Sequence, residues 1–305
     1  MKFISVRLLR LASVASLAFL AAVNGRSQTV VGVDAFGSLF SLNLSAPTAA
    51  STIGNLGFVP EGIDFRPGTS TLFAIDVGAT TTRLYTVDVA TGAAMGIGVG
   101  FATAGTVGAL SYDLSTASSF GFDFNPTTLQ ADGSIRIRLT GNNGTNLRLN
   151  SDTGGIAAVD GLLTGSIGAV AYTNSAVATM GGITALFDID YMSNSLFFQN
   201  PPNAGTLNSV GALGFDVGPN IGFDILTRGG DNFGYLVDTI GSNAANLYSV
   251  NLSTGAATAL GTANRSFTGG FAVVPVPEPS TYGLAAAGVL VAVTLLRRRS
   301  KTTAK

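Results

Sequence analysis

The chain of 305 residues contains neither cysteine nor histidine. Without cysteine it has no disulfide framework, no thiol nucleophile and no thiolate metal ligand. Without histidine it lacks the imidazole that serves most catalytic triads, general bases and zinc sites. Carboxylates, tyrosine, serine and a few basic side chains are left for chemistry. Stability must come from core burial and backbone hydrogen bonding, which suits a large repetitive β-sheet protein.

Charge is also scarce, since charged residues make up only 11% of the chain and 16 basic residues nearly balance 17 acidic ones. Many of the basic residues lie in residues 1–26 and 297–305, so the region between them is acidic. We therefore expect no nucleic-acid partner, because nothing predicts a broad basic surface. The length suffices for one large domain or two small ones.

The N-terminus has the order of a secretory signal peptide. Lys2, Arg7 and Arg10 precede the apolar run from Leu11 to Val23, and small and polar residues follow. The run is apolar all round, which distinguishes it from a buried amphipathic helix. Residues 1–27 are therefore predicted to be a signal helix that the Sec export machinery and signal peptidase process.

The C-terminus contains a second apolar run, from Tyr282 to Leu296. As a helix it reaches roughly 22 Å against a hydrocarbon core of roughly 30 Å, so it spans a membrane only with help from its flanks. Arg297, Arg298 and Arg299 follow it and are expected to anchor that end in the cytoplasm. The body of the chain then lies outside.

The tripeptide Pro277-Glu278-Pro279 stands directly before this run. Tripeptide, apolar helix and arginine cluster together resemble the PEP-CTERM sorting signal of bacterial exported proteins. The resemblance implies that exosortase, a membrane-embedded transpeptidase, recognises the tripeptide and removes the tail, residues 276–305. The protein would then be transiently anchored in the inner membrane before it reaches the cell surface or the medium. The alternative is an ordinary C-terminal membrane anchor.

The region between, residues 28–275, repeats itself. Each copy has period-2 alternation, a turn rich in Ser, Thr, Asp and Gly, and a second short apolar run, which is a β-hairpin signature. The spacing of successive copies is near the lengths of kelch and WD40 propeller blades. The clearest are LFSLNLSAPTAASTIG from Leu39, LYTVDVATGAAMGIG from Leu84 and LYSVNLSTGAATALG from Leu247, and phrases such as GIDF from Gly62 and GFDF from Gly121 precede them.

These patterns predict an all-β fold, a β-propeller of about five four-stranded blades. A sixth blade is expected if the stretch from Gly100 to Asn125 contains one. The first copy, from Val30, lacks a strand, and Gly269 to Val274 forms a lone strand, so the two should pair and close the ring. A two-sheet sandwich or an irregular β-solenoid is the competing architecture.

The body also resembles the family catalogued as domain of unknown function 4394. The resemblance rests on phrases including GFDFNPT from Gly121, NLRLNSDTG from Asn146 and QNPPNAGTLNSVGALG from Gln199, and the sequence departs from the family's pattern after Thr127. The family implies no established activity, so this resemblance supports the fold and leaves the function open.

Aspartates are the main candidates for chemistry. Two facing carboxylates can hydrolyse a glycosidic bond, but an aspartate that recurs with the repeat more simply hydrogen-bonds a turn or the next sheet. Asp188, Asp190 and Asn194 could together bind Ca²⁺, although alternate strand positions that face solvent are normally polar. We expect no other metal or cofactor. The recurring aspartates are Asp64, Asp76, Asp88, Asp123, Asp188, Asp190 and Asp224.

Arg136 and Arg138 alternate with Ile on one predicted strand, and Arg148 follows nearby. These arginines either bind an acidic polysaccharide or form a solvated edge that discourages aggregation. The sequence as a whole predicts a non-enzymatic binding or structural module at the cell surface or in the extracellular polysaccharide matrix. A secreted glycan hydrolase or lyase is the alternative, and a protein-interaction scaffold is a third reading.

Overall fold

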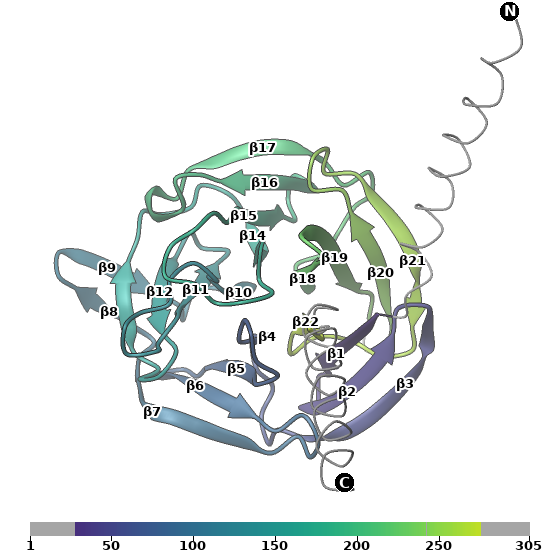
Figure 1. The fold of residues 1–305 in the computed structure, drawn as a ribbon, viewed down its shortest axis with the longest axis horizontal. Helices are drawn as coiled ribbons and strands as arrows, with labels where there is room; N and C mark the ends of the chain where they lie inside the picture. Colours follow the sequence, from purple (N-terminus) through teal and green to yellow (C-terminus); the bar gives the residue numbers. More distant parts are fainter. Residues whose placement is uncertain (1–27, 242, 276–305) are drawn as a thin grey trace, which may run out of the picture.

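The computed structural model describes residues 28–241 and 243–275. These residues form five four-stranded antiparallel sheets arranged in a ring, with one short 3₁₀ helix at Pro202–Ala204 (Figure 1). The prediction of a five-bladed β-propeller is therefore confirmed. The N-terminal signal helix and the C-terminal transmembrane helix that the sequence predicts lie outside the described residues. Within the described part of the chain, no helix is long and apolar enough to cross a membrane.

From the axis outward, blade 1 consists of β22 (Phe271–Val273), β1 (Thr29–Val33), β2 (Ser38–Asn43) and β3 (Ala46–Asn55). Blade 2 consists of β4 (Gly62–Phe65), β5 (Leu72–Val77), β6 (Thr81–Val87) and β7 (Ala94–Ala102). Blade 3 consists of β10 (Phe120–Phe124), β11 (Arg136–Gly141), β12 (Asn146–Asn150) and β13 (Ile156–Val159). Blade 4 consists of β14 (Ile167–Tyr172), β15 (Leu186–Asp190), β16 (Ser195–Gln199) and β17 (Leu207–Ala212). Blade 5 consists of β18 (Ile221–Arg228), β19 (Asp231–Thr239), β20 (Ala245–Val250) and β21 (Ala257–Ala263).

The ring closes within blade 1, as the sequence predicts. β22 comes from the end of the body and pairs antiparallel with β1 from its start, with Val30 opposite Val273. The side chain of Gln28 adds a hydrogen bond of 2.9 Å to the carbonyl oxygen of Val274. One blade thus joins both ends of the body, which ties the integrity of the ring to this pairing.

The stretch from Gly100 to Asn125 does not supply a sixth blade. It contains a two-stranded hairpin, β8 (Ala104–Val107) and β9 (Leu110–Asp113), that projects from the rim of the ring (Figure 1). Two short strands alone cannot cover a neighbouring blade, and blades 2 and 3 pack directly on each other. Their shared core includes Phe73, Phe124 and Ile137.

All five inner strands run in the same direction along the axis, so the propeller has an entry face, where they begin, and an exit face, where they end. A glycine near the start of each inner strand allows close approach at the axis. A Cβ on Gly62 would lie 2.5 Å from the Cβ of Phe122, and a Cβ on Gly222 would lie 2.5 Å from that of Phe271. The ring of inner strands is therefore narrow at this level.

The repeated Thr-Gly turns connect neighbouring blades. At three junctions the carbonyl oxygen of a turn threonine lies so close to a glycine on the outer strand of the preceding blade that a Cβ on that glycine would overlap it. The pairing of the outer strand shifts register, as at a β-bulge, beside each of these glycines. The pairs are Gly54 with Thr91, Gly98 with Thr153, and Gly211 with Thr254.

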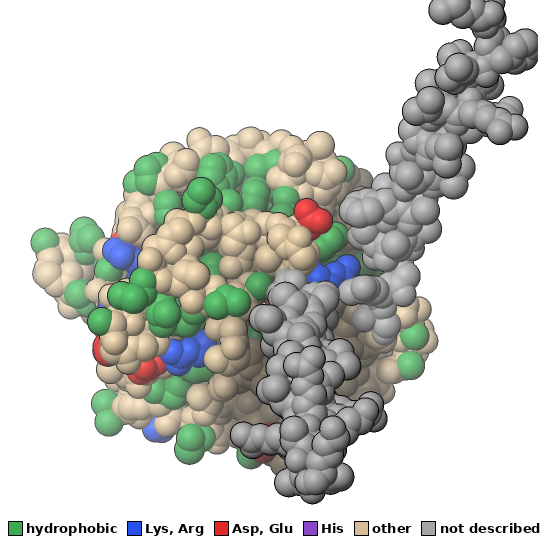
Figure 2. Space-filling model, viewed as in Figure 1, with side chains coloured by type: hydrophobic (Ala, Val, Ile, Leu, Met, Phe, Trp, Pro, Cys, Tyr) green, Lys and Arg blue, Asp and Glu red, His purple; other side chains and the backbone are tan. Residues whose placement is uncertain are grey.

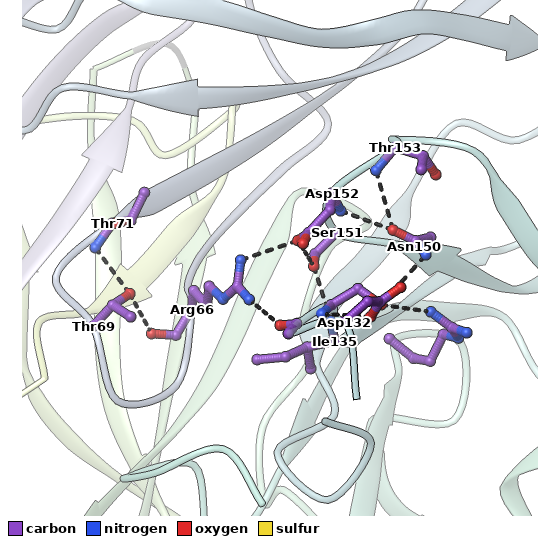
Figure 3. A network of polar contacts seen from close by, with 12 residues as sticks. Arg66, Thr69, Thr71, Asp132, Ile135, Asn150, Ser151, Asp152 and Thr153 are labelled. Carbon is purple, nitrogen blue, oxygen red and sulfur yellow. Dashed lines mark hydrogen bonds and ion pairs between the residues drawn. The ribbon is translucent and has the colours of Figure 1, made fainter. Parts of the chain in front are cut away.

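Polar contacts on the exit face also connect blades 2 and 3. The guanidinium of Arg66, after β4, lies 3.1 Å from the Asp152 carboxylate and also donates to the carbonyl oxygen of Gly133 (Figure 3). Ser151 accepts a hydrogen bond of 2.9 Å from the backbone of Ile135 and donates one of 2.6 Å to Asp152. The turns of the two blades are thus fixed to each other.

Candidate functional site

The entry face contains a funnel on the propeller axis, with a volume of about 500 Å³. Its walls come from the segments that lead into the inner strands of blades 1, 2, 3 and 5. Below it, the ring of inner-strand glycines narrows to a neck of about 20 Å³, room for roughly one water molecule. Hydroxyl, amide and apolar groups line the funnel, among them Ser115, Ser118, Asn220, Phe267 and Thr268.

Glu61 is the one charged side chain among the described residues that line the funnel. Its Oε2 atom accepts a hydrogen bond of 2.7 Å from the backbone N–H of Val77. Burial, together with repulsion from nearby Asp76, raises the pKa of Glu61 from 4.5 to about 7. Equivalent positions on the other inner strands carry Phe120, Ile167, Ile221 or Gly269, so Glu61 breaks the repeat, which makes it the carboxylate of most functional interest.

Three other carboxylates, those of Asp64, Asp123 and Asp224, meet at the axis. All three are buried, and their closest oxygens lie within 4.8 Å of one another. Each accepts a hydrogen bond from a backbone N–H on the inner strand of the next blade. The distances are 2.8 Å from Phe124 to Asp64, 3.0 Å from Tyr172 to Asp123, and 2.6 Å from Val273 to Asp224.

The hydrogen bonds of these three residues agree with the prediction that repeated aspartates bind the backbone of the next sheet. The aspartate does not recur in every blade, because β14 and β22 carry none. The exposed Asp88 serves a turn instead, accepting a hydrogen bond of 2.8 Å from the backbone of Ala90. Repeated aspartates therefore fix backbone at two places, the axis and the turns.

The axial carboxylates are electrostatically strained. Burial raises the pKa of all three, to about 6 for Asp224, and mutual repulsion raises the pKa of Asp64 and Asp123 further. Carboxylate oxygens are the ligands that Ca²⁺ prefers, so this group could hold a cation as well as shared protons. Backbone N–H groups already donate to both oxygens of Asp64 and Asp224 and to one oxygen of Asp123.

Of the three predicted calcium ligands, Asp190 and Asn194 have separate partners, while neither carboxylate oxygen of the buried Asp188 has a hydrogen-bond partner among the described residues. Asp188 and Asp190 do not face solvent, as the alternation in the sequence implied, because both are buried. Asp190 Oδ1 accepts hydrogen bonds from the backbone of Met192 and Ser193, which follow β15. Asn194 binds the carboxylate of Asp216 at 2.8 Å and the backbone of Val217 at 2.9 Å.

The prediction that Arg138 lies on a solvated strand edge is wrong. β11 is the second strand of blade 3, and blade 4 covers this side of it, so Arg138 is only 1% exposed. Its guanidinium lies 2.6 Å from the Asp160 carboxylate and also contacts the Tyr172 hydroxyl at 3.3 Å. Arg148 pairs with the same Asp160 carboxylate at 2.8 Å. A buried ion-pair network therefore joins blades 3 and 4.

The phrase QNPPN, which gave no functional signal in the sequence, completes this network. Asn203 accepts a hydrogen bond of 2.9 Å from Arg138. The carbonyl oxygen of Pro202 accepts hydrogen bonds from the side chains of Gln199, at 2.6 Å, and Asn146, at 3.2 Å. This part of the phrase is thus a blade-to-blade contact, and nothing in it opens to the funnel.

Comparison with known proteins identifies the body. The family model described as "Domain of unknown function (DUF4394)" matches residues 38–272. The chain belongs to this family. A second model, the PEP-CTERM protein-sorting motif, matches residues 275–299, directly after the DUF4394 body. This match contains Pro277, Glu278, Pro279 and the arginines at 297–299, which lie outside the described residues. The motif implies export, membrane-associated sorting and exosortase as the processing partner.

Similarity to solved structures is distant, and no curated protein matches the DUF4394 chain. TolB from Acinetobacter baumannii is 13% identical, with a TM-score of 0.41 over 82% of this chain and 67% of TolB. A protein from Bacteroides uniformis provisionally named a 6-phosphogluconolactonase is 12% identical, with a TM-score of 0.37 over 78% and 82% of the two chains. A protein from Lactobacillus plantarum is 10% identical, with a TM-score of 0.39 over 81% and 99%. Likeness at this level decides neither activity nor ligand.

Proposed function

We propose that the DUF4394 body is a non-enzymatic binding or structural module that acts at the cell surface or in the extracellular polysaccharide matrix. Exosortase processes the precursor at Pro277 to Pro279, after Sec-dependent export and signal-peptide removal. The observation that carries the proposal is the sorting motif, which begins where a closed propeller ends. The funnel on the entry face is the binding site of the module.

The lining of the funnel favours a neutral, hydroxyl-rich ligand such as the end or side branch of a polysaccharide. Ser115, Ser118, Asn220 and Thr268 offer hydroxyl and amide groups, and Phe267 offers an apolar surface. An acidic polysaccharide fits less well, because no basic side chain among the described residues lines the funnel and Glu61 does. Polar groups beside an apolar surface are the usual composition of a small-molecule site.

Processing is tested in the native cells by intact mass and fractionation of the wild type and of a variant with Pro277→Ala, Glu278→Ala and Pro279→Ala. The wild type should appear at the surface or in the medium without its tail, while the variant stays whole in the membrane. If both remain whole in the membrane, the tail is a plain anchor and the processing step is wrong.

Binding is tested with a panel of neutral and acidic glycans against the wild type and the variant Thr268→Lys, which extends a long side chain within the funnel. Arg136→Lys on β11, outside the funnel, is the matched control. Retention of a neutral glycan by the wild type and the control but not by Thr268→Lys supports the proposal. Equal retention by all three places the binding elsewhere.

A glycan hydrolase or lyase remains a second candidate function, because Glu61 departs from the repeat and its pKa is raised to about 7. That value is suited to a general acid at neutral pH. Glu61→Gln separates the two functions. Loss of glycan cleavage with retained binding would favour the enzyme, whereas binding without cleavage by either protein favours the module.

A further inference from the structure

The exit face is the part of the body nearest to the membrane before processing. β22 is an inner strand that ends on this face beside the axis, and the sorting motif begins at residue 275. Only seven residues, 275–281, separate Val274 from the apolar run that begins at Tyr282. Even fully extended, seven residues reach at most about 25 Å. While the tail is attached, the exit face cannot move far from the lipid surface.

A loop that connects β14 and β15, residues 174–184, covers the axis on this same face. Ser175 donates a hydrogen bond of 2.9 Å to the carbonyl oxygen of Ile225 on β18, the inner strand of blade 5. Thr179 then exchanges backbone hydrogen bonds with the start of the β10–β11 connection in blade 3, at 2.7 Å to Pro126 and 3.0 Å from Leu129. The loop therefore bridges two blades, and its position is fixed by contacts on both sides.

The loop presents apolar side chains to solvent. Val177, Met180 and Ile183 are 59%, 70% and 86% exposed, and residues 174–184 contain no charged side chain. Figure 2 looks onto this face and shows hydrophobic side chains gathered over the inner part of the ring, with basic side chains beside them. Arg228 is the last residue of inner strand β18 and is partly exposed, whereas Arg66, after β4, is also partly exposed but is paired with Asp152. Apolar side chains with a basic group beside them suit the interface of a lipid bilayer.

We propose that this loop, residues 174–184, contacts the outer surface of the cytoplasmic membrane while the tail is attached, so that the body rests on its exit face and the funnel points away from the lipid. The proposal depends on membrane-associated sorting and not on the ligand of the funnel. Lipid is favoured over a second copy of the chain because the tail brings the membrane to this face. Three exposed side chains also fall short of the roughly 1,200 Å² that a stable protein interface buries.

Because the native chain contains no cysteine, a single introduced cysteine can be labelled at one defined position. The full chain carries a single cysteine at Met180→Cys, labelled with an environment-sensitive fluorophore, and is reconstituted into phosphatidylcholine–phosphatidylglycerol vesicles that contain a lipid-borne quencher. Phe36→Cys is the matched control, because Phe36 lies in the β1–β2 turn on the entry face and is 76% exposed. We expect lipid quenching at residue 180 to be at least about threefold stronger than at residue 36.

A second variant keeps the test decisive if a label disturbs the loop. Val177→Ser, Met180→Ser and Ile183→Ser together, with the cysteine moved to Thr179→Cys, should reduce quenching toward the level at residue 36 without changing the melting temperature. Equal quenching at residues 180 and 36 in vesicle-bound protein would overturn the proposal. So would a chain that fails to stay with the vesicles, or label-to-label cross-links that show a second copy covering the loop.

Discussion

The axial carboxylates make a strong and unusual prediction, that the body becomes less stable as the pH rises from 4 to 8. Burial raises the pKa of Asp224 from 3.8 to about 6. Because the folded-state pKa is higher than the unfolded one, folding favours the protonated form. Its stabilising contribution is complete below about pH 4 and is lost as the pH rises through 6. At 1.36 kcal/mol per pKa unit, Asp224 alone loses about 3 kcal/mol.

Asp123→Asn is the perturbation that isolates this effect. The amide oxygen can still accept the hydrogen bond from the backbone of Tyr172, but one of the three charges is gone. At pH 8 the variant should have the higher free energy of unfolding, because burial and repulsion from Asp64 and Asp224 disfavour the ionised form of Asp123. The gain is about 1.4 kcal/mol for each unit by which folding raises the pKa of Asp123, and each kcal/mol raises the melting temperature of a body of this size by roughly 2 to 4 °C. At pH 4, where the wild-type carboxyls are protonated, the free energies of unfolding of the variant and the wild type should agree within about 1 kcal/mol.

The assay is thermal and urea unfolding of residues 28–275 followed by circular dichroism across this pH range, with a chelator present. Asp88→Asn is the matched control. Asp88 is exposed, and hydrogen bonds from Ala90 and Thr91 lower its pKa, so the slope between pH 4 and 8 should not change. Parallel profiles for the wild type and Asp123→Asn would refute the reasoning. Repetition with calcium, if it stabilises only the wild type, would show that a cation and not a proton neutralises the site.

Two further predictions concern the junctions between blades. Gly211→Ala should lower the free energy of unfolding by more than about 2 kcal/mol, because the new Cβ overlaps the carbonyl oxygen of Thr254. Gly155→Ala is the control, because the atom nearest to its new Cβ is 3.6 Å away. In the same urea titration it should leave the free energy of unfolding unchanged or raise it slightly. Arg138→Lys should lower the free energy of unfolding by about 3 to 5 kcal/mol, because a lysine cannot replace the fork that holds the buried network. Arg136→Lys, at the half-buried start of the same strand, should change it by no more than about 0.5 kcal/mol. Similar losses in a variant and its control would contradict either prediction.

Much of the fold follows from the sequence because the blade is a local unit. Period-2 alternation and the Thr-Gly turn specify each hairpin within about 15 residues, so repeated copies specify repeated blades. The closing strand was also predictable, since Gly269 to Val274 had no hairpin of its own. The blade count stayed open because residues 100–125 carry strand-like alternation, and only packing decides that β8 and β9 leave the ring.

The side-chain contacts between neighbouring blades could not be predicted in this way. Alternation separates the two faces of a strand, and solvent is the usual partner of the polar face. In a propeller both faces of an inner sheet lie against neighbouring blades, so the polar faces that carry Arg138 and Asp188 are buried. The funnel was missed for a related reason, since its walls come from four blades and no single segment carries its signature. One signal was available, because Glu61 is the acid that interrupts the repeat at the start of an inner strand.

The two faces of the propeller can therefore be considered separately when a function is assigned. Closure through β22 places residue 275, where the match to the sorting motif begins, on the exit face, because an inner strand that begins at the entry face must end there. The same topology places the funnel, and Glu61, at the far end of the axis from the tail. A ligand can thus reach the funnel before and after processing. In the proposed function, removal of the tail changes where the body travels, and the narrow ring of inner strands separates that event from the proposed ligand site in the funnel.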